Sequence, residues 1–279
     1  LKTNRDIINT FNNLCIYVFF IVSFIKVNLY FLYLTVKMTI KVSLNYSPNF
    51  STYRRIKKNI KYLILHYTGM RSEIEAINRL TNVQSKVSCH YFIKRNGSII
   101  LMVPEIHEAW HAGKSKWKKE KLLNRKSIGI EISNKGHQFG YQSFTKKQIK
   151  SLIKISKYLI KKYKIKKTNV LGHSDIAYER KKDPGEKFPW EYLSKNKIGN
   201  WYKINKKILI KIRNNKISKI EEVEFFKYLS KIGYLIKTNQ FLTKIKLVKS
   251  FQRHFRQSLI NGKIDKECLI IAQNLSKFS

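Results

Sequence analysis

Two histidines and one aspartate stand where the chain could build a metal site. His66 ends a short apolar run of strand length, and His173 ends another. Asp183 precedes Pro184-Gly185, where the chain is expected to turn sharply. Two imidazoles and one carboxylate would leave the fourth position of a tetrahedral zinc ion open, as in catalytic sites. Spacing alone is a weak indication, because a strand-end histidine is more often a packed, hydrogen-bonded residue.

The segments around these residues predict the fold class. Short apolar runs and amphipathic segments interleave from Met38 to about residue 200, which predicts an α/β protein with a central mixed sheet and flanking helices. We expect helices after the capping signals at Ser72 and Thr145. We expect a hairpin that turns at Asn96-Gly97 and further strands at 61–67, 127–133 and 168–173.

The remainder of the chain is predicted to be helical. Residues 201–218 are rich in Lys, Ile and Asn without a clean period, and we interpret them as a linker between domain 38–200 and domain 219–279. The last segment predicts three short helices, each with one apolar stripe that must pack on the others. The sequence therefore predicts a small three-helix domain after the α/β domain.

The first 37 residues differ from all that follows. Lys2 and Arg5 precede an apolar run, Leu14 to Ile25, and a second apolar run continues to about residue 36. A basic start before an apolar stretch resembles a signal peptide or an anchor. The uninterrupted run is short for a membrane span, which needs roughly 20 residues. Two alternatives stay open: membrane association through residues 14–36, or an over-extended reading frame with the true start at Met38.

Charge and cysteines exclude some classes of function. The 57 Lys and Arg against 17 Asp and Glu give a net charge of +40, which attracts polyanions. The lysines are spread along the chain, and neither an RNA-binding aromatic motif nor zinc-finger spacing is present, so we expect no nucleic-acid partner. The three cysteines lie far apart without a CxxC pair, which indicates neither a disulfide framework nor a thiolate zinc site.

Five separated sequence words resemble a known family. They are LHYT (65–68), SCHYFIKRNGSI (88–99), AWHAG (109–113), SIGIEI (127–132) and GHSDIAYERKKDPGEKFPW (172–190). In this order they resemble the type-2 N-acetylmuramoyl-L-alanine amidases, the family that includes the peptidoglycan-recognition proteins. The resemblance covers about residues 38–202. It is greatest to two-domain bacterial enzymes that process wall and anhydro-muropeptide fragments.

The resemblance assigns roles to five residues. It implies a zinc site of His66, His173 and Asp183, with Glu131 as the acid/base and Lys181 as the group that stabilises the oxyanion. A positioned carboxylate can take a proton from water and pass it to the leaving amine, and a fixed cation can stabilise a tetrahedral oxyanion. The implied reaction is hydrolysis of the amide between the lactyl group of N-acetylmuramic acid and L-alanine.

The sequence gives weaker indications of function for the other histidines and for two tryptophans. His90 and His111 lie within the family words and are expected to shape the groove or to bond to the backbone. Trp110 and Trp117 are expected either to line that groove or to pack in the core. Two further histidines, His137 and His254, show nothing beyond surface or helix positions.

The C-terminal segment resembles the small three-helix peptidoglycan-binding domain. The resemblance rests on LSKIGY (229–234), VKSFQRHFRQ (248–257) and NGKID (261–265). An arbitrary helical bundle is the alternative. We therefore expect a monomeric zinc amidase whose partner is peptidoglycan or a muropeptide.

Two other functions and two compartments stay open. A non-catalytic peptidoglycan-recognition protein is the main rival, and a basic nucleic-acid-binding protein is the second. We expect the cell envelope as the location, either periplasmic or membrane-associated, with the cytoplasm as the alternative.

Overall fold

A computed structural model describes residues 40–236 and 241–278 of the 279-residue chain. The residues from Val42 onward form one compact unit. The predicted anchor or signal in residues 1–37 lies outside the described residues. Within the described ranges, no helix is both long enough and apolar enough to cross a lipid bilayer.

The centre of this unit is a mixed six-stranded sheet in the order β1-β5-β4-β9-β3-β10. Strands β4 and β5 are antiparallel and form the predicted hairpin, whereas the other neighbouring pairs are parallel. The strands are β1 (Val42–Leu44), β3 (Tyr62–Tyr67), β4 (Tyr91–Ile93), β5 (Ile99–Leu101), β9 (Ser127–Ile132) and β10 (Val170–Gly172). Two small two-stranded sheets pair β2 (Phe50–Ser51) with β6 (Glu108–Ala109), and β7 (Lys116–Trp117) with β8 (Glu120–Lys121).

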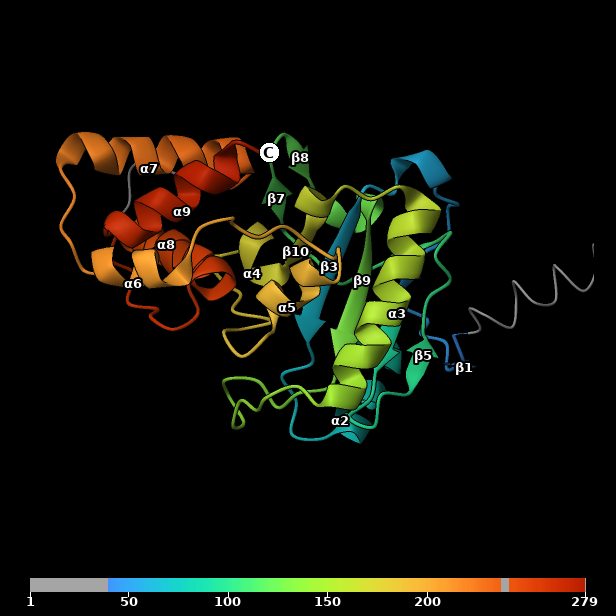
Figure 1. The fold of residues 1–279 in the computed structure, drawn as a ribbon. Coiled ribbons are helices and arrows are strands. Elements are labelled where there is room, and N and C mark those ends of the chain that lie inside the picture. The colour runs from blue at the N-terminus through green and yellow to red at the C-terminus, as the bar shows by residue number, and fades with distance from the viewer. Residues whose placement is uncertain (1–39, 237–240, 279) are drawn as a thin grey trace, which may run out of the picture. The chain divides into compact units, whose positions relative to one another are not determined.

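Helices cover the sheet, as the pattern predicts (Figure 1). The helices of this part are α2 (Glu73–Thr81), α3 (Lys146–Tyr163), α4 (His173–Ile176) and α5 (Trp190–Lys195). The α2 helix begins where the Ser72 hydroxyl accepts from the Glu75 amide, and α3 begins with a complete capping box between Thr145 and Gln148. The α/β class with a central mixed sheet is therefore confirmed.

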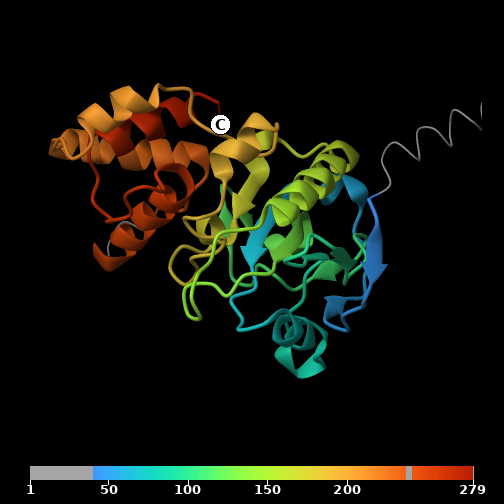
Figure 2. The same cartoon turned by 60° about the horizontal axis from the view of Figure 1, so that its bottom comes forward.

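Four more helices follow: α6 (Lys206–Ile212), α7 (Lys219–Ile232), α8 (Phe241–Phe255) and α9 (Lys266–Ser276). The last three are the helices that the apolar stripes predict, with α7 ending at Gly233 and α9 capped by Asp265. Figures 1 and 2 show this group beside the part of the sheet that contains β10. The residues predicted to be a linker contain α6, whose Leu209 is fully buried.

One hydrophobic cluster spans both parts of the unit. Phe225 of α7 and Phe251 of α8 belong to the same cluster of buried side chains as Ile64 of β3 and Trp117 of β7. The Trp117 ring packs edge-on against Tyr234, with 4.8 Å between ring centroids. The C-terminal helices therefore bury apolar surface against the sheet part as well as against one another.

Candidate active site

Three adjacent parallel strands bring the predicted site residues to one edge of the sheet. In the pairing of β3 with β9, His66 stands directly opposite Glu131. The next strand along, β10, ends at Gly172, and His173 follows as the first residue of α4. Because side chains alternate along strands, this register places His66 and Glu131 on the same face of the sheet.

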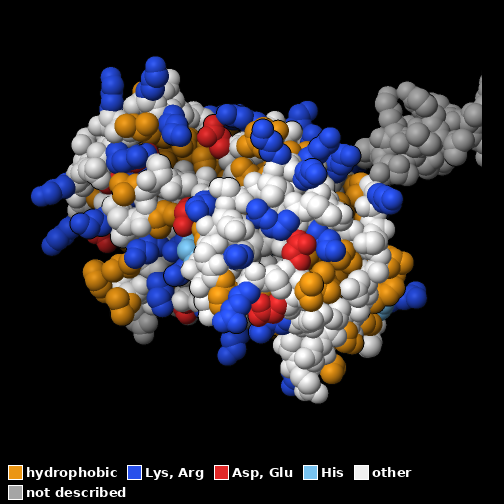
Figure 3. Space-filling view, turned by 90° about the horizontal axis from the view of Figure 1, so that it is seen from below, with side chains coloured by type: hydrophobic (Ala, Val, Ile, Leu, Met, Phe, Trp, Pro, Cys, Tyr) orange, Lys and Arg blue, Asp and Glu red, His pale blue; other side chains and the backbone are white. Residues whose placement is uncertain are grey.

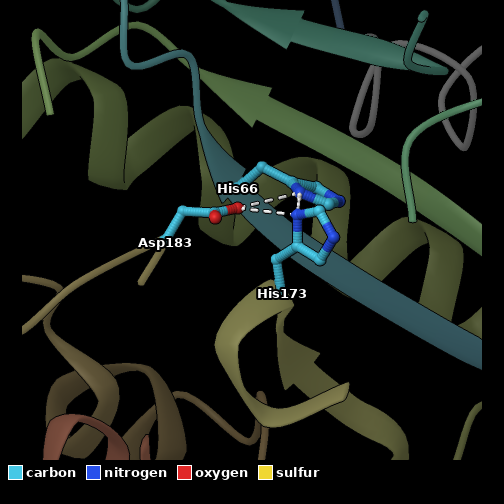
Figure 4. Close-up of side chains that lie close together, drawn as sticks. All are labelled: His66, His173 and Asp183. Carbon is cyan, nitrogen blue, oxygen red and sulfur yellow. Dashed lines mark hydrogen bonds and ion pairs between the residues drawn. The ribbon is translucent and has the colours of Figure 1, made fainter. Parts of the chain in front are cut away.

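The three predicted metal ligands converge, as Figure 4 shows. The Nδ1 atoms of His66 and His173 lie 3.0 Å apart, and Oδ2 of Asp183 lies 3.0 Å from the first and 3.1 Å from the second. All three side chains are buried, and the ligand atoms lie within 4.8 Å of one another. The backbone amide of Ser174 donates to the carbonyl of Asp183 at 2.8 Å, which ties the two ends of the ligand loop together.

A chain of hydrogen bonds fixes which nitrogen of His66 faces the site. The Ser127 hydroxyl donates to the Leu123 carbonyl at 2.6 Å, so its oxygen accepts from Nε2 of His111 at 3.1 Å. The other nitrogen of the neutral His111 ring, Nδ1, then accepts from Nε2 of His66 at 3.0 Å. His66 therefore turns the lone pair of its Nδ1 toward His173 and Asp183.

The second imidazole is oriented by a backbone carbonyl. Nε2 of His173 donates to the Ala112 carbonyl at 3.1 Å, which leaves the lone pair on Nδ1. Two imidazole lone pairs and one carboxylate thus face one another with no proton between them. Such a set repels itself unless a cation lies among its members, and its donors are those that zinc prefers. The residues therefore fit a zinc ion.

Charges and burial keep these ligands in the protonation states that metal binding requires. Burial lowers the pKa of His66 to about 4; the neighbouring His173 and Lys181 act in the same direction, and Asp183 opposes them. Burial alone would raise the pKa of Asp183, but its interactions with the adjacent His173 and His66 outweigh that effect and hold the pKa well below its usual range. Near neutral pH the site therefore offers a neutral imidazole and an ionised carboxylate.

Glu131 has the properties expected of a proton-transfer group. Its side chain is 15% exposed, and Oε1 lies 4.0 Å from Nδ1 of His66. Oε2 is buried without a hydrogen-bond partner among the described residues. Burial raises the pKa of Glu131 well above its usual value, the charge of Asp183 adds to the rise, and Lys181 opposes it. An unpartnered carboxylate oxygen beside the ligands can accept a proton from water there.

The site opens into a cleft of about 790 Å³. Glu131, Lys181 and two of the predicted metal ligands, His173 and Asp183, line it, so the predicted catalytic groups face one volume. Trp110 also lines this cleft, as predicted for one of its two possible roles. Trp117 is 2% exposed and packs in the core, so its alternative as a groove residue is wrong.

Two histidines to which the sequence assigned no role make defined hydrogen bonds in the structure. His137 lines the cleft, where its Nδ1 accepts from the Tyr67 hydroxyl at 2.9 Å and its Nε2 donates to Glu186 at 3.0 Å. His254 of α8 is buried and donates from Nδ1 to Oδ2 of Asp175 at 2.7 Å. Their partners lie 49 and 79 positions away, a distance that no local pattern records.

Comparisons with known proteins point in one direction. Residues 56–186 match the N-acetylmuramoyl-L-alanine amidase family. The chain is 35% identical over 229 residues to the N-acetylmuramoyl-L-alanine amidase AmiD of Escherichia coli, which covers 77% of this chain and 82% of that protein. It is 42% identical over 113 residues to the 1,6-anhydro-N-acetylmuramyl-L-alanine amidase AmpD of Haemophilus influenzae, covering 40% of this chain and 59% of that one.

Solved structures agree over a longer stretch. The complex of E. coli AmiD with anhydro-N-acetylmuramic acid-L-Ala-D-gamma-Glu-L-Lys superposes with a TM-score of 0.70 at 33% identity, covering 82% of this chain and 92% of that one. AMPDH3 of Pseudomonas aeruginosa in complex with anhydromuramic pentapeptide gives a TM-score of 0.69 at 29% identity, covering 86% and 99%. The chain belongs to the N-acetylmuramoyl-L-alanine amidase family.

Proposed function

We propose that this N-acetylmuramoyl-L-alanine amidase uses a zinc ion held by His66, His173 and Asp183. The reaction is hydrolysis of the amide that joins the lactyl group of N-acetylmuramic acid to L-alanine. The observation that carries the zinc proposal is the convergence of two imidazole lone pairs and a carboxylate beside the unpartnered Oε2 of Glu131. Zinc bound at such a site lowers the pKa of water and polarises a carbonyl.

The chain's own groups supply the proton transfers and the charge stabilisation. We propose that Glu131 takes a proton from the attacking water and returns it to the leaving nitrogen, because its raised pKa suits both steps. Lys181 lines the same cleft and carries the positive charge that can stabilise the developing oxyanion. His111 and Ala112 act behind the ligands, where they hold the two imidazoles in the required tautomers.

Soluble muropeptide is the substrate that the neighbouring structures favour, since AmiD and AMPDH3 were each solved with an anhydromuramyl peptide. We also propose that residues 219–279 bind peptidoglycan. The three helices form as the resemblance to a peptidoglycan-binding domain predicts, and the structural match to AmiD extends well beyond residues 56–186. Figure 3 shows Lys and Arg spread over the face seen from below, which suits an acidic wall polymer.

Metal removal tests the proposed function. We expect one zinc per chain, loss of hydrolysis of a soluble anhydro-muropeptide after chelation, and recovery on adding zinc. Glu131→Gln keeps the shape of the side chain but cannot accept the proton, so it should retain zinc while turnover falls by about 10²- to 10⁴-fold. Full activity in a rigorously metal-free preparation would refute the zinc proposal, and an unchanged rate for Glu131→Gln would remove that residue from the mechanism.

A wall-binding module is most useful where intact wall is present, so we propose the cell envelope. Fractionation with N-terminal sequencing of the native protein tests this, because a soluble species that begins at Met38 or Thr39 would refute membrane association.

A further inference from the structure

The loop that carries two of the proposed zinc ligands has few regular elements of its own. It runs from Gly172 to Phe188, contains His173, Lys181 and Asp183, and includes only the short helix α4. A loop of this length needs outside contacts to hold one conformation, because ordering each residue costs conformational entropy. Some of those contacts come from Tyr141, Ala112 and Lys114. Others come from one face of α8 and the turn after it, which lie some 70 residues further along the chain.

The contacts follow a helical spacing. Positions 250, 253, 254 and 257 lie three, one and three residues apart, which places them on one side of α8 and of the turn after it. The Ser250 hydroxyl donates to the Ser174 carbonyl at 2.8 Å. At the far end of the loop, Nε2 of Gln257 donates to the Phe188 carbonyl at 2.6 Å. The two ends of the ligand loop are thus bonded to the same helical face.

The third contact is a buried polar network beneath His173. Asp175 is 1% exposed, and its Oδ2 accepts from the Gly172 amide and from Nδ1 of His254, each at 2.7 Å. Its Oδ1 accepts from the Tyr234 hydroxyl, also at 2.7 Å, in the segment after α7. The His254 ring stacks on Trp190 with 3.9 Å between centroids, which fixes the imidazole plane.

The fourth contact reaches the wall of the cleft. Nε of Arg253 lies 3.8 Å from Glu186 in the same loop. Glu186 accepts from His137, and His137 accepts from the hydroxyl of Tyr67, the residue that follows His66 on β3. The helix therefore contacts the surroundings of all three proposed ligands, through the loop for two of them and through this chain of side chains for the other.

We propose that Ser250, Arg253 and His254 of α8, with Gln257 in the turn after it, position the zinc-ligand loop, so that the C-terminal helices are part of the catalytic unit in addition to their proposed wall-binding role. This inference rests on the proposed zinc site. The four side chains touch neither the ligand atoms nor the cleft, and they act through the loop. Loosening Ser250 and Gln257, which do not bond to Glu186, should weaken zinc binding and slow turnover, while the substrate-binding walls, and with them KM, stay nearly unchanged.

The test uses the full chain with Ser250→Ala, Gln257→Ala and the double variant. Matched controls are Ser276→Ala and Gln273→Ala in α9, where the Ser276 hydroxyl donates to the Gln273 carbonyl of its own helix and the Gln273 amide donates to the Tyr228 hydroxyl. Zinc affinity is measured by chelator competition, and the ligand geometry by the visible spectrum of the Co²⁺-substituted protein. The double variant should lose about 10- to 100-fold in zinc affinity, with an altered Co²⁺ spectrum and a lower kcat.

A metal-independent measurement separates this inference from the proposed function. In metal-free protein, amide hydrogen exchange of residues 172–188 should be faster in the double variant than in wild type and unchanged in both controls. If wild type binds no zinc, the proposed function fails, and the exchange result still decides whether the helix holds the loop. Exchange equal to wild type overturns the inference, as does a loss of zinc affinity in the controls as large as in the double variant. If the double variant does not fold, the two single variants decide by the same measurements.

Discussion

Gly129 offers a sharp test of the hydrogen-bond chain behind His66. This glycine lies in β9 with the His111 ring directly over it. A Cβ added there would lie 2.6 Å from both Nδ1 and Cδ2 of that ring, with Cγ nearer still, whereas ordinary contacts begin at 3.4 Å. In Gly129→Ala, His111 must therefore retreat by about 1 Å.

The expected loss of stability in Gly129→Ala can be worked out from the hydrogen bonds that hold the His111 ring. His111 bonds to His66 at 3.0 Å and to Ser127 at 3.1 Å, and a shift of about 1 Å takes both contacts beyond hydrogen-bond range. Each lost bond costs about 1 kcal/mol, and overpacking adds about 1–3 kcal/mol. We expect Gly129→Ala to lower the free energy of unfolding by about 3–5 kcal/mol. Because the His66 tautomer is no longer fixed, zinc affinity should fall about 10-fold or more.

Urea unfolding of the metal-free protein measures the first effect, and chelator competition measures the second. The control is the same substitution in a His111→Ala background, where no ring opposes the new methyl group. There, Gly129→Ala should be neutral or slightly stabilising, since alanine loses less backbone entropy on folding. An equal cost in both backgrounds, or a Gly129→Ala protein as stable as wild type, would refute the reasoning.

Three further outcomes are expected. Lys181→Ala should retain zinc yet lower kcat by about 10²- to 10³-fold, whereas Lys182→Ala, which removes an exposed neighbour, should change kcat far less. Arg256→Met should lower stability by about 3 kcal/mol in thermal unfolding, because it strips a buried partner from Asp265 and Glu267. Burial and the charge of Arg55 hold the pKa of His90 well below its usual value of about 6.5. The neutral His90 therefore contributes to the free energy of unfolding above pH ~6.5, and this contribution is lost as the pH falls. His90→Asn should flatten that acid slope by up to about 1.4 kcal/mol per pH unit, as denaturant titrations across pH 4–7 would show.

The convergence of the proposed metal ligands could be expected from the sequence, because each lies beside a local signal and within a segment that resembles the family. His66 and His173 end apolar strands, and parallel strands deliver their carboxyl ends to one edge of a sheet. The sequence could not supply the strand order, which places β9 and β10 on either side of β3. That order results from packing over the whole sheet, so the pairing of Glu131 with His66 first appears in the structure.

The roles of His137 and His254 were not predictable for a different reason. Each hydrogen bond joins residues far apart in sequence, and hydrophobic periodicity describes only the element on which a residue lies. The segment 201–218 shows the same limit. Its α6 helix is short and mostly exposed, with Leu209 as its buried residue. One buried position does not produce the apolar periodicity by which a helix is predicted.

The contacts made by α8 also set an order of events during synthesis. Residues 250–257 follow Asp183 by 67 to 74 positions, which a ribosome adding about 5–20 residues per second needs about 3 to 15 s to make. During that interval the nascent chain already has every proposed ligand but lacks the helix that bonds to their loop. An mRNA truncated after the codon for Trp190 but before α8 would therefore encode a chain that has all the proposed ligands but lacks the helix that bonds to their loop. Proteases readily cleave a loop without such contacts.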